Sequence, residues 1–111
     1  MDLKISNEEL RNYLKTLNLY EDPLGYWYFN NTRTWIIASY GDYIKIVNDI
    51  TLYGDTDILF SEGMIEKRYY ISDEQDVEFI KKQANKLYQQ YKKLITQYKI
   101  KTIEKDFVND N

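Results

Sequence analysis

Carboxylate side chains are the residues of this sequence to consider first for chemistry, because other reactive groups are scarce. The chain has no cysteine and no histidine, which excludes thiol nucleophiles, imidazole bases and zinc sites built from those residues. The candidate cation-binding group consists of Asp55, Asp57, Glu62 and Glu66. Hard cations need several oxygen ligands, and an Asp-x-Asp pair in a turn supplies few of them. Turn formation explains these aspartates adequately, so we expect no metal site, no cofactor and no enzymatic activity.

Aromatic residues form a second group, which suits recognition better than catalysis. The chain has 12 tyrosines in 111 residues, and Tyr26, Trp27, Tyr28 and Phe29 are consecutive. Successive side chains of a strand point to opposite faces, so one pair points away from whatever buries the other. We take Tyr26 and Tyr28, with nearby Arg33, as candidate partner-binding residues, because tyrosine and arginine are enriched at interface hot spots. The alternative is that both pairs lie in the core, where aromatic rings are also common.

Lysine residues are concentrated near the end of the sequence. The net charge of the chain is −3, but residues 1–79 carry 7 basic and 15 acidic side chains (net −8), whereas residues 80–105 carry 8 lysines and one glutamate (net +7). Such a run favours binding to nucleic-acid phosphates or to an acidic protein, although a solvated helix face explains it as well. The candidate partner-binding residues in this region are Lys92, Lys93, Tyr98 and Lys99.

The middle of the chain is expected to form the sheet that positions the aromatic residues. Short segments rich in β-branched and aromatic residues alternate there with Asn, Asp and Gly, which favour tight turns. Connections this short join antiparallel neighbours and cannot make parallel crossovers. We predict an antiparallel meander of about five or six short strands within residues 26–71, at 26–29, 33–38, 43–47, 50–53, 57–60 and 64–71.

A helix is predicted on each side of this sheet. Residues 1–20 contain a capping pattern that begins at Ser6 and an apolar stripe, and we expect Asn18 to end this helix. A second capping pattern begins at Ser72 and opens a long basic helix over residues 72–105. The apolar seam of the second helix consists of Val77, Ile80, Ala84, Leu87, Tyr91, Leu94 and Tyr98. The predicted fold is therefore a single α+β domain over residues 1–111, in which the long helix packs on one sheet face and residues 106–111 fray.

These features predict a small non-enzymatic protein-binding module. Residues with AT-rich codons are abundant (13 Ile, 12 Lys, 9 Asn, 12 Tyr), which indicates a gene from an AT-rich bacterium or one of its mobile elements. Because catalytic residue types are missing while aromatic and lysine-rich surfaces are plentiful, we expect an inhibitor or adaptor encoded by a phage or mobile element, such as an anti-defence protein of the anti-CRISPR type. The alternative function is a nucleic-acid-binding accessory protein that uses the lysine-rich helix and exposed aromatic residues. A homodimer formed through the apolar seam is a further expectation. No apolar run is long enough to cross a bilayer, and residues 1–4 lack the pattern of a signal peptide, so we expect a cytoplasmic protein without membrane contact.

Overall fold

The computed structural model describes residues 4–30, 32–52 and 59–98, and these residues form two helices and a six-stranded sheet. The elements in chain order are α1 (Glu8–Thr16), β1 (Tyr20–Glu21), β2 (Tyr26–Tyr28), β3 (Ile37–Ser39), β4 (Tyr43–Leu52), β5 (Leu59–Met64), β6 (Tyr69–Tyr70) and α2 (Glu74–Tyr98). The strands pair antiparallel in the order β1-β2-β3-β4-β5, and β6 also pairs with β4. This arrangement confirms the predicted α+β fold with its antiparallel meander.

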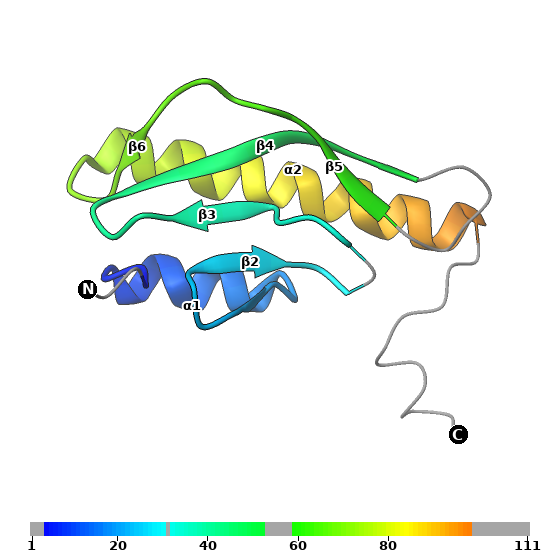
Figure 1. Cartoon of the computed structure of the whole chain (residues 1–111), viewed down its shortest axis with the longest axis horizontal. Helices are drawn as coiled ribbons and strands as arrows, with labels where there is room; N and C mark the ends of the chain where they lie inside the picture. The colour runs from blue at the N-terminus through cyan, green and yellow to red at the C-terminus, as the bar shows by residue number, and fades with distance from the viewer. Residues whose placement is uncertain (1–3, 31, 53–58, 99–111) are drawn as a thin grey trace.

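Both helices cover the same face of the sheet. In the view of Figure 1 they lie behind the strands, with α2 behind β4 and α1 behind β2. Helix α2 packs against β4 and β6, and α1 packs against α2. Stacked rings join α2 to the sheet, since Phe29 stacks on Tyr91 with centroids 4.5 Å apart and Tyr69 stacks on Phe79 at 4.6 Å. The prediction of a long helix packed on one sheet face is therefore confirmed.

The N-terminal caps of both helices lie one residue after the predicted serines. The side-chain oxygen of Asn7 accepts a hydrogen bond from the Leu10 amide at 3.0 Å and caps α1. At the start of α2, one carboxylate oxygen of Asp73 accepts from the Gln75 and Asp76 amides at 2.9 and 3.2 Å. Asparagine, aspartate and serine are similarly good caps, so residue type alone did not decide between adjacent positions.

The C-terminal end of α1 depends on Asn18, as predicted. Asn18 has a φ of +65°, in the left-handed region that ends helices. Its amide donates to the Lys15 carbonyl at 3.1 Å, and the Leu19 amide donates to the Leu14 carbonyl at 3.4 Å. These two bonds form a Schellman motif, and Leu14 and Leu19 are both buried beside it. The motif turns the chain directly from α1 into β1.

A turn predicted in the middle of β4 does not form, because side chains of α2 satisfy the backbone there. Gln83 is buried, and its amide nitrogen donates to the carbonyl oxygens of Val47 and Asn48 at 3.0 and 3.1 Å. The side-chain oxygen of Gln90 accepts from the Ile50 amide at 3.4 Å. The two strands predicted at this point are therefore one continuous strand of 10 residues.

The other strands also differ in their bounds from the predicted segments. The turn predicted at 62–63 lies inside β5, where Gly63 adopts a φ of +72° without ending the strand. The segment predicted at 64–71 is divided between the end of β5 and the two residues of β6. The segment predicted at 33–38 becomes regular only at Ile37, and β1 was not predicted at all.

The edges of the sheet offer little free backbone. Strand β1 has only two residues, and the connection between β2 and β3 contacts β5. There the Arg33 amide donates to the Leu59 carbonyl at 2.7 Å, and the Ser61 amide donates to Thr34 Oγ1 at the same distance. Because short or covered edges disfavour the addition of another strand, these edges are poor sites for pairing with a strand of another chain.

Substitutions at Asn18 should have opposite effects according to their tolerance of positive φ. Asn18→Val should lower the free energy of unfolding by about 1–2 kcal/mol, because β-branched residues are strained in this region. Asn18→Gly should leave it unchanged or raise it slightly, since glycine adopts positive φ without strain. Urea denaturation measures both. As a control, Asn12→Gly in the exposed middle of α1 should lower the free energy of unfolding by about 0.3 kcal/mol, because glycine is a poorer helix former than asparagine; equal effects of glycine at both positions would contradict the assigned helix end.

Replacement of Gln83 should test how α2 holds β4. Gln83→Met keeps the length of the side chain but removes the donor for the buried Val47 carbonyl oxygen and the partly buried Asn48 carbonyl oxygen, and should lower the free energy of unfolding by about 2 kcal/mol. Gln89→Met, on the exposed side of the same helix, should change it by less than about 0.5 kcal/mol. Chemical denaturation of both variants measures the difference, and similar stabilities would show that the bonds to β4 contribute nothing.

Candidate functional site

Strand β2 separates its aromatic residues between the two faces of the sheet. Trp27 lies within it and Phe29 directly after it, and both are completely buried on the face that the helices cover. Tyr26 and Tyr28 are half-buried on the opposite face. The structure thus confirms that one pair points away from the core, and it identifies Tyr26 and Tyr28 as that pair.

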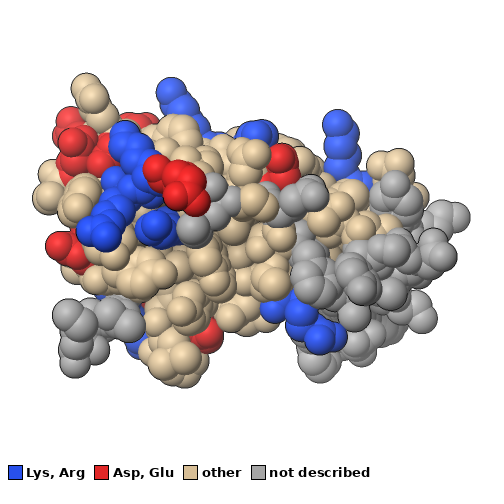
Figure 2. All heavy atoms as spheres, turned by 45° about the horizontal axis from the view of Figure 1, so that its top comes forward, with Lys and Arg blue, Asp and Glu red and all other residues tan. Residues whose placement is uncertain are grey.

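Strand register brings further tyrosines to the same face as Tyr26 and Tyr28. Tyr20 of β1 lies opposite Tyr28, and Tyr43 of β4 lies opposite Tyr70 of β6. Directly paired residues of an antiparallel sheet point to the same side. We use the term tyrosine face for the surface formed by Tyr20, Tyr26, Tyr28, Trp35, Tyr40, Tyr43 and Tyr70. Figure 2 shows a mainly uncharged area across the middle of the molecule, with lysine and arginine side chains on both sides of it.

One part of the tyrosine face lies over β1 and β2. The rings of Tyr20 and Tyr28 stack with centroids 5.8 Å apart, and those of Tyr26 and Trp35 stack at 5.9 Å. Each half-buried ring therefore supports a second ring. Tyr20 remains 46% exposed, so a partner can reach its ring directly.

The other part of the tyrosine face lies over β4 and β6. Tyr40 stacks on Tyr43 at 5.0 Å, Tyr70 lies 5.8 Å from Tyr43 in a tilted arrangement, and the Arg68 guanidinium lies 4.8 Å from the Tyr43 ring centre. Tyr40 and Tyr70 are 37% and 40% exposed. This combination of tyrosine and arginine is the composition typical of interface hot spots.

Ala38 and Lys45 occupy the space between these two parts. Tyr26, Ala38 and Lys45 are cross-strand neighbours in one row across β2, β3 and β4. Ala38 is completely buried and Lys45 is half-buried. The row therefore places a cationic side chain within an aromatic surface, where it can pair with an acidic group of a partner.

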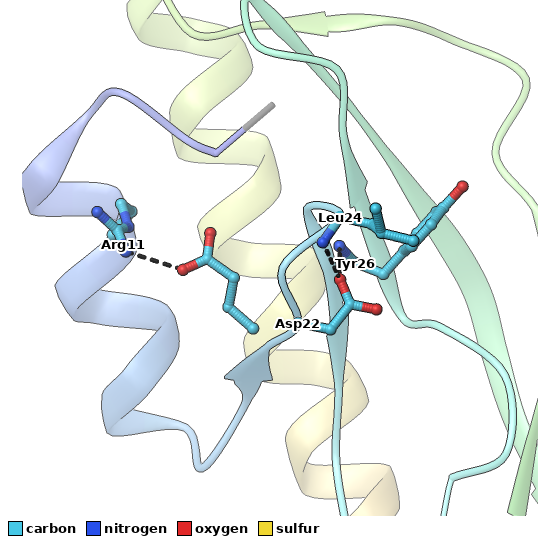
Figure 3. A network of polar contacts seen from close by, with 5 residues as sticks. Arg11, Asp22, Leu24 and Tyr26 are labelled. Atoms are coloured by element: carbon cyan, nitrogen blue, oxygen red, sulfur yellow. Dashed lines mark hydrogen bonds and ion pairs between the residues drawn. The ribbon is translucent and has the colours of Figure 1, made fainter. Parts of the chain in front are cut away.

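Asp22 fixes the turn that leads into β2. One of its carboxylate oxygens accepts hydrogen bonds from the Leu24 and Tyr26 amides, both at 2.9 Å (Figure 3). Burial, followed by the negative charge of Asp22 and a hydrogen bond to it, raises the pKa of Tyr28 above its ordinary value of 10.0. Asp22 thus holds both the backbone of the turn and the phenol of Tyr28.

An ion pair on the opposite face holds β1 in place. Arg11 of α1 contacts Glu21 at 2.8 Å (Figure 3), and the Glu21 side chain is only 8% exposed. Removing one partner of a buried pair costs more than removing an exposed one, because the remaining charge stays desolvated. This contact ties the two-residue strand that carries Tyr20 to the first helix.

The predicted site residues fall into separate places. Arg33 is exposed in the connection between β2 and β3, and no ring contact joins it to a tyrosine among the residues that the structure describes. Lys92 and Lys93 are exposed on α2, away from the tyrosine face, because α2 packs on the other side of the sheet. The Tyr98 side chain and Lys99 lie outside the described part of the chain.

The predicted apolar seam of α2 is largely occupied within the chain. Its first five residues, Val77 to Tyr91, are buried in the core. Leu94 and the neighbouring Ile95 are half-buried against that core. Homodimer formation through this helix stays a prediction, and the described residues left for it are Leu94 and Ile95.

The candidate cation-binding residues lie mostly outside the described part of the chain. This applies to Asp55, Asp57 and the side chain of Glu62, whereas Glu66 is described and exposed. Among the described residues there is no group of three or more acidic, histidine or cysteine side chains that could hold a metal ion.

Comparisons with known proteins add no further constraint on the site. No protein-family model matches the chain, and searches of curated proteins and of solved structures gave no match. None of the helices in the described ranges combines the length and apolar character needed to span a bilayer.

Sequence reasoning missed several residues of the tyrosine face. The alternation of Ile44 and Ile46 with Tyr43 and Lys45 is visible in the sequence, and it predicts that Tyr43 and Lys45 share the face opposite the core. Tyr20 gave no comparable signal, because a two-residue strand is too short to show a period.

The pKa of Tyr28 predicts a specific dependence of stability on pH. Above pH 10 the unfolded chain loses the Tyr28 proton while the folded protein keeps it. The contribution of Tyr28 to stability is therefore complete below pH 10 and is lost as the pH rises through the folded-state pKa. We expect ¹³C NMR of ring-labelled tyrosine, with Tyr28→Phe for assignment, to give a midpoint above 10. Asp22→Asn retains the acceptor for both amides and should lower this midpoint; an unchanged value would exclude the role of Asp22.

Proposed function

We propose that this chain is a small non-enzymatic protein-binding module, an inhibitor or adaptor, that contacts its partner through the tyrosine face. The observation that carries the proposal is the gathering of seven aromatic side chains on the sheet face opposite the helices. Tyrosine combines a large apolar ring with a hydroxyl group and loses little conformational entropy on binding. A surface of this kind therefore suits a protein partner.

The stacking of the rings on one another favours a protein partner over nucleic-acid bases. Bases bind to free aromatic faces, whereas Tyr20 and Tyr28, and likewise Tyr26 and Trp35, are stacked on each other. The pairs support one another as a relatively rigid surface. Rigid aromatic anchors reduce the entropic cost of association, which is the advantage of a preorganised interface.

Charged residues around the rings indicate the polarity of the partner. Lys45 lies within the tyrosine face and Arg68 lies over Tyr43. Neither Lys45 nor Arg68 forms an ion pair with a described carboxylate, since the ion pairs found there use Arg11, Lys67 and Lys81. A partner surface with acidic groups among apolar ones would satisfy both cations.

Substitution of exposed tyrosines should weaken binding of the partner protein. Tagged protein from the native host should capture a protein at a near-stoichiometric level, and Tyr40→Ala with Tyr70→Ala should reduce its recovery about tenfold or more, as expected for the loss of hot-spot residues. Quantitative mass spectrometry of the captured material measures the ratio.

Phe79→Ala is the matched control for this experiment. Phe79 is 36% exposed and stacked on one neighbouring ring, as Tyr40 is at 37%, but it lies on α2. Phe79→Ala and Tyr40→Ala alone each remove one stacked ring, so these two single changes should have similar effects on stability, while only Phe79→Ala should retain the partner fully. Capture of no protein by the unaltered chain, or equal recovery with the tyrosine variant, would refute the proposal.

A further inference from the structure

The exposed side of α2 forms a second surface that differs chemically from the tyrosine face. Helix α2 buries Ile80, Leu87 and Tyr91 against the sheet, so its opposite side faces solvent. With 3.6 residues per turn, the exposed residues from 82 to 97 fall on that solvent side. We use the term lysine face for this surface, whose lysines are Lys82, Lys86, Lys92 and Lys93.

The charge of the lysine face is not neutralised by described residues. The sequence has no acidic residue between Glu78 and Tyr98. Lys81, beside this surface, lies 3.7 Å from both Glu9 and Glu78. By contrast, none of the four lysines of the lysine face has an ion pair with a carboxylate of the described ranges. The positive potential is therefore available to an anionic ligand.

Uncharged residues on the same surface are hydrogen-bond donors. Asn85, Gln89, Thr96 and Gln97 are exposed between the lysines, and a shallow hollow is lined by Gln89, Gln90, Thr96 and Gln97 together with three of the lysines. Lysine, amide and hydroxyl side chains are the groups that contact phosphate oxygens in complexes with DNA. Protein interfaces are instead enriched in aromatic residues and depleted in lysine.

The length of the lysine face fits a duplex. From residue 82 to residue 97 the helix extends about 22 Å at ~1.5 Å per residue. A duplex carries one phosphate charge per ~1.7 Å of its axis, so this length lies beside about a dozen charges. The chain has no arginine after Arg68, and the bidentate arginine contact to guanine is therefore absent from α2. Lysine is the only cationic side chain type on this surface, and its ammonium group contacts phosphate as a compact point charge, so contact with the backbone is favoured over contact with base edges.

We infer that the lysine face binds the phosphate backbone of double-stranded nucleic acid without sequence preference. This surface and the tyrosine face lie on opposite sides of the molecule, since α2 packs on the sheet face opposite the tyrosines. A protein partner and a duplex can therefore be bound together. The inference does not depend on the proposed protein partner, because it rests on α2 alone.

The dependence of binding on salt tests this inference. Fluorescence anisotropy with labelled DNA duplexes of about 20 base pairs, in two unrelated sequences, should show equal affinities that fall steeply between about 50 and 200 mM KCl. Four phosphate contacts predict a slope of about −3.6 for log K against log salt, and Lys86→Gln with Lys93→Gln should bring it to about −1.8. Affinity at the lowest salt should fall roughly tenfold or more.

Lys15→Gln with Lys67→Gln is the matched control, because it changes the net charge equally but lies outside the lysine face. It should leave slope and affinity nearly unchanged, and Tyr40→Ala with Tyr70→Ala should also retain DNA binding. No binding at the lowest salt would overturn the inference. Equal losses of DNA affinity in the Lys86/Lys93 and Lys15/Lys67 variants, or a clear preference for one of the two DNA sequences, would also overturn it. Tighter binding of poly-L-glutamate than of DNA would overturn it as well and would indicate an acidic protein ligand.

Discussion

The packing of Trp27 and Phe29 against the helices is the interaction on which the rest of the structure depends. Phe29 stacks on Tyr91 of α2 at 4.5 Å, and both Trp27 and Phe29 are fully buried. Because side chains alternate along a strand, burying this pair directs Tyr26 and Tyr28 to the other face. Antiparallel register then extends the division to β1, β3, β4 and β6, so the packing of β2 separates a core face from the tyrosine face.

Polar contacts between the helices and the strands stabilise the separation of the two sheet faces at places where apolar packing is insufficient. Gln83 and Gln90 of α2 hydrogen-bond the backbone of β4 and keep it extended through residues that favour a turn. The Arg11–Glu21 pair does the same for β1, where two residues provide too few backbone bonds to hold a strand. In both cases a side chain from a helix stabilises the extended conformation of a strand. The helices therefore cover the sheet and also determine how long its strands are.

How well the sequence predicts the fold depends on how far apart in the sequence the interacting residues lie. Helices and the antiparallel meander are encoded by local periodicity and short connections, and the structure confirms them. The extent of β4 depends on Gln83 and Gln90, which are about 35 to 40 residues away in sequence, and no local pattern at Asn48 reports such a contact. The cap positions show the same limit on a smaller scale, because residue type does not distinguish Ser6 from Asn7, or Ser72 from Asp73, as a helix cap.

The candidate sites were predictable to different degrees for the same reason. Alternation along the strand was enough to predict that Tyr26 and Tyr28 lie on one face. Predicting that Tyr20, Tyr43 and Tyr70 lie on the same face would have required the register between the strands. The lysines of α2 were evident from composition. Their separation from the tyrosines became clear only when α2 was placed on the far side of the sheet.

The covered edge of β5 has a consequence for the behaviour of the protein at high concentration. A strand edge with free backbone groups can pair with a strand of another molecule, and repeated pairing of this kind builds fibrils. The Thr34 and Ser61 hydroxyl groups, 2.6 Å apart, hold the covering segment against β5. Together with the Arg33–Leu59 backbone bond, this contact keeps the β5 edge covered. Without these contacts the edge would offer neighbouring molecules a template for repeated strand addition.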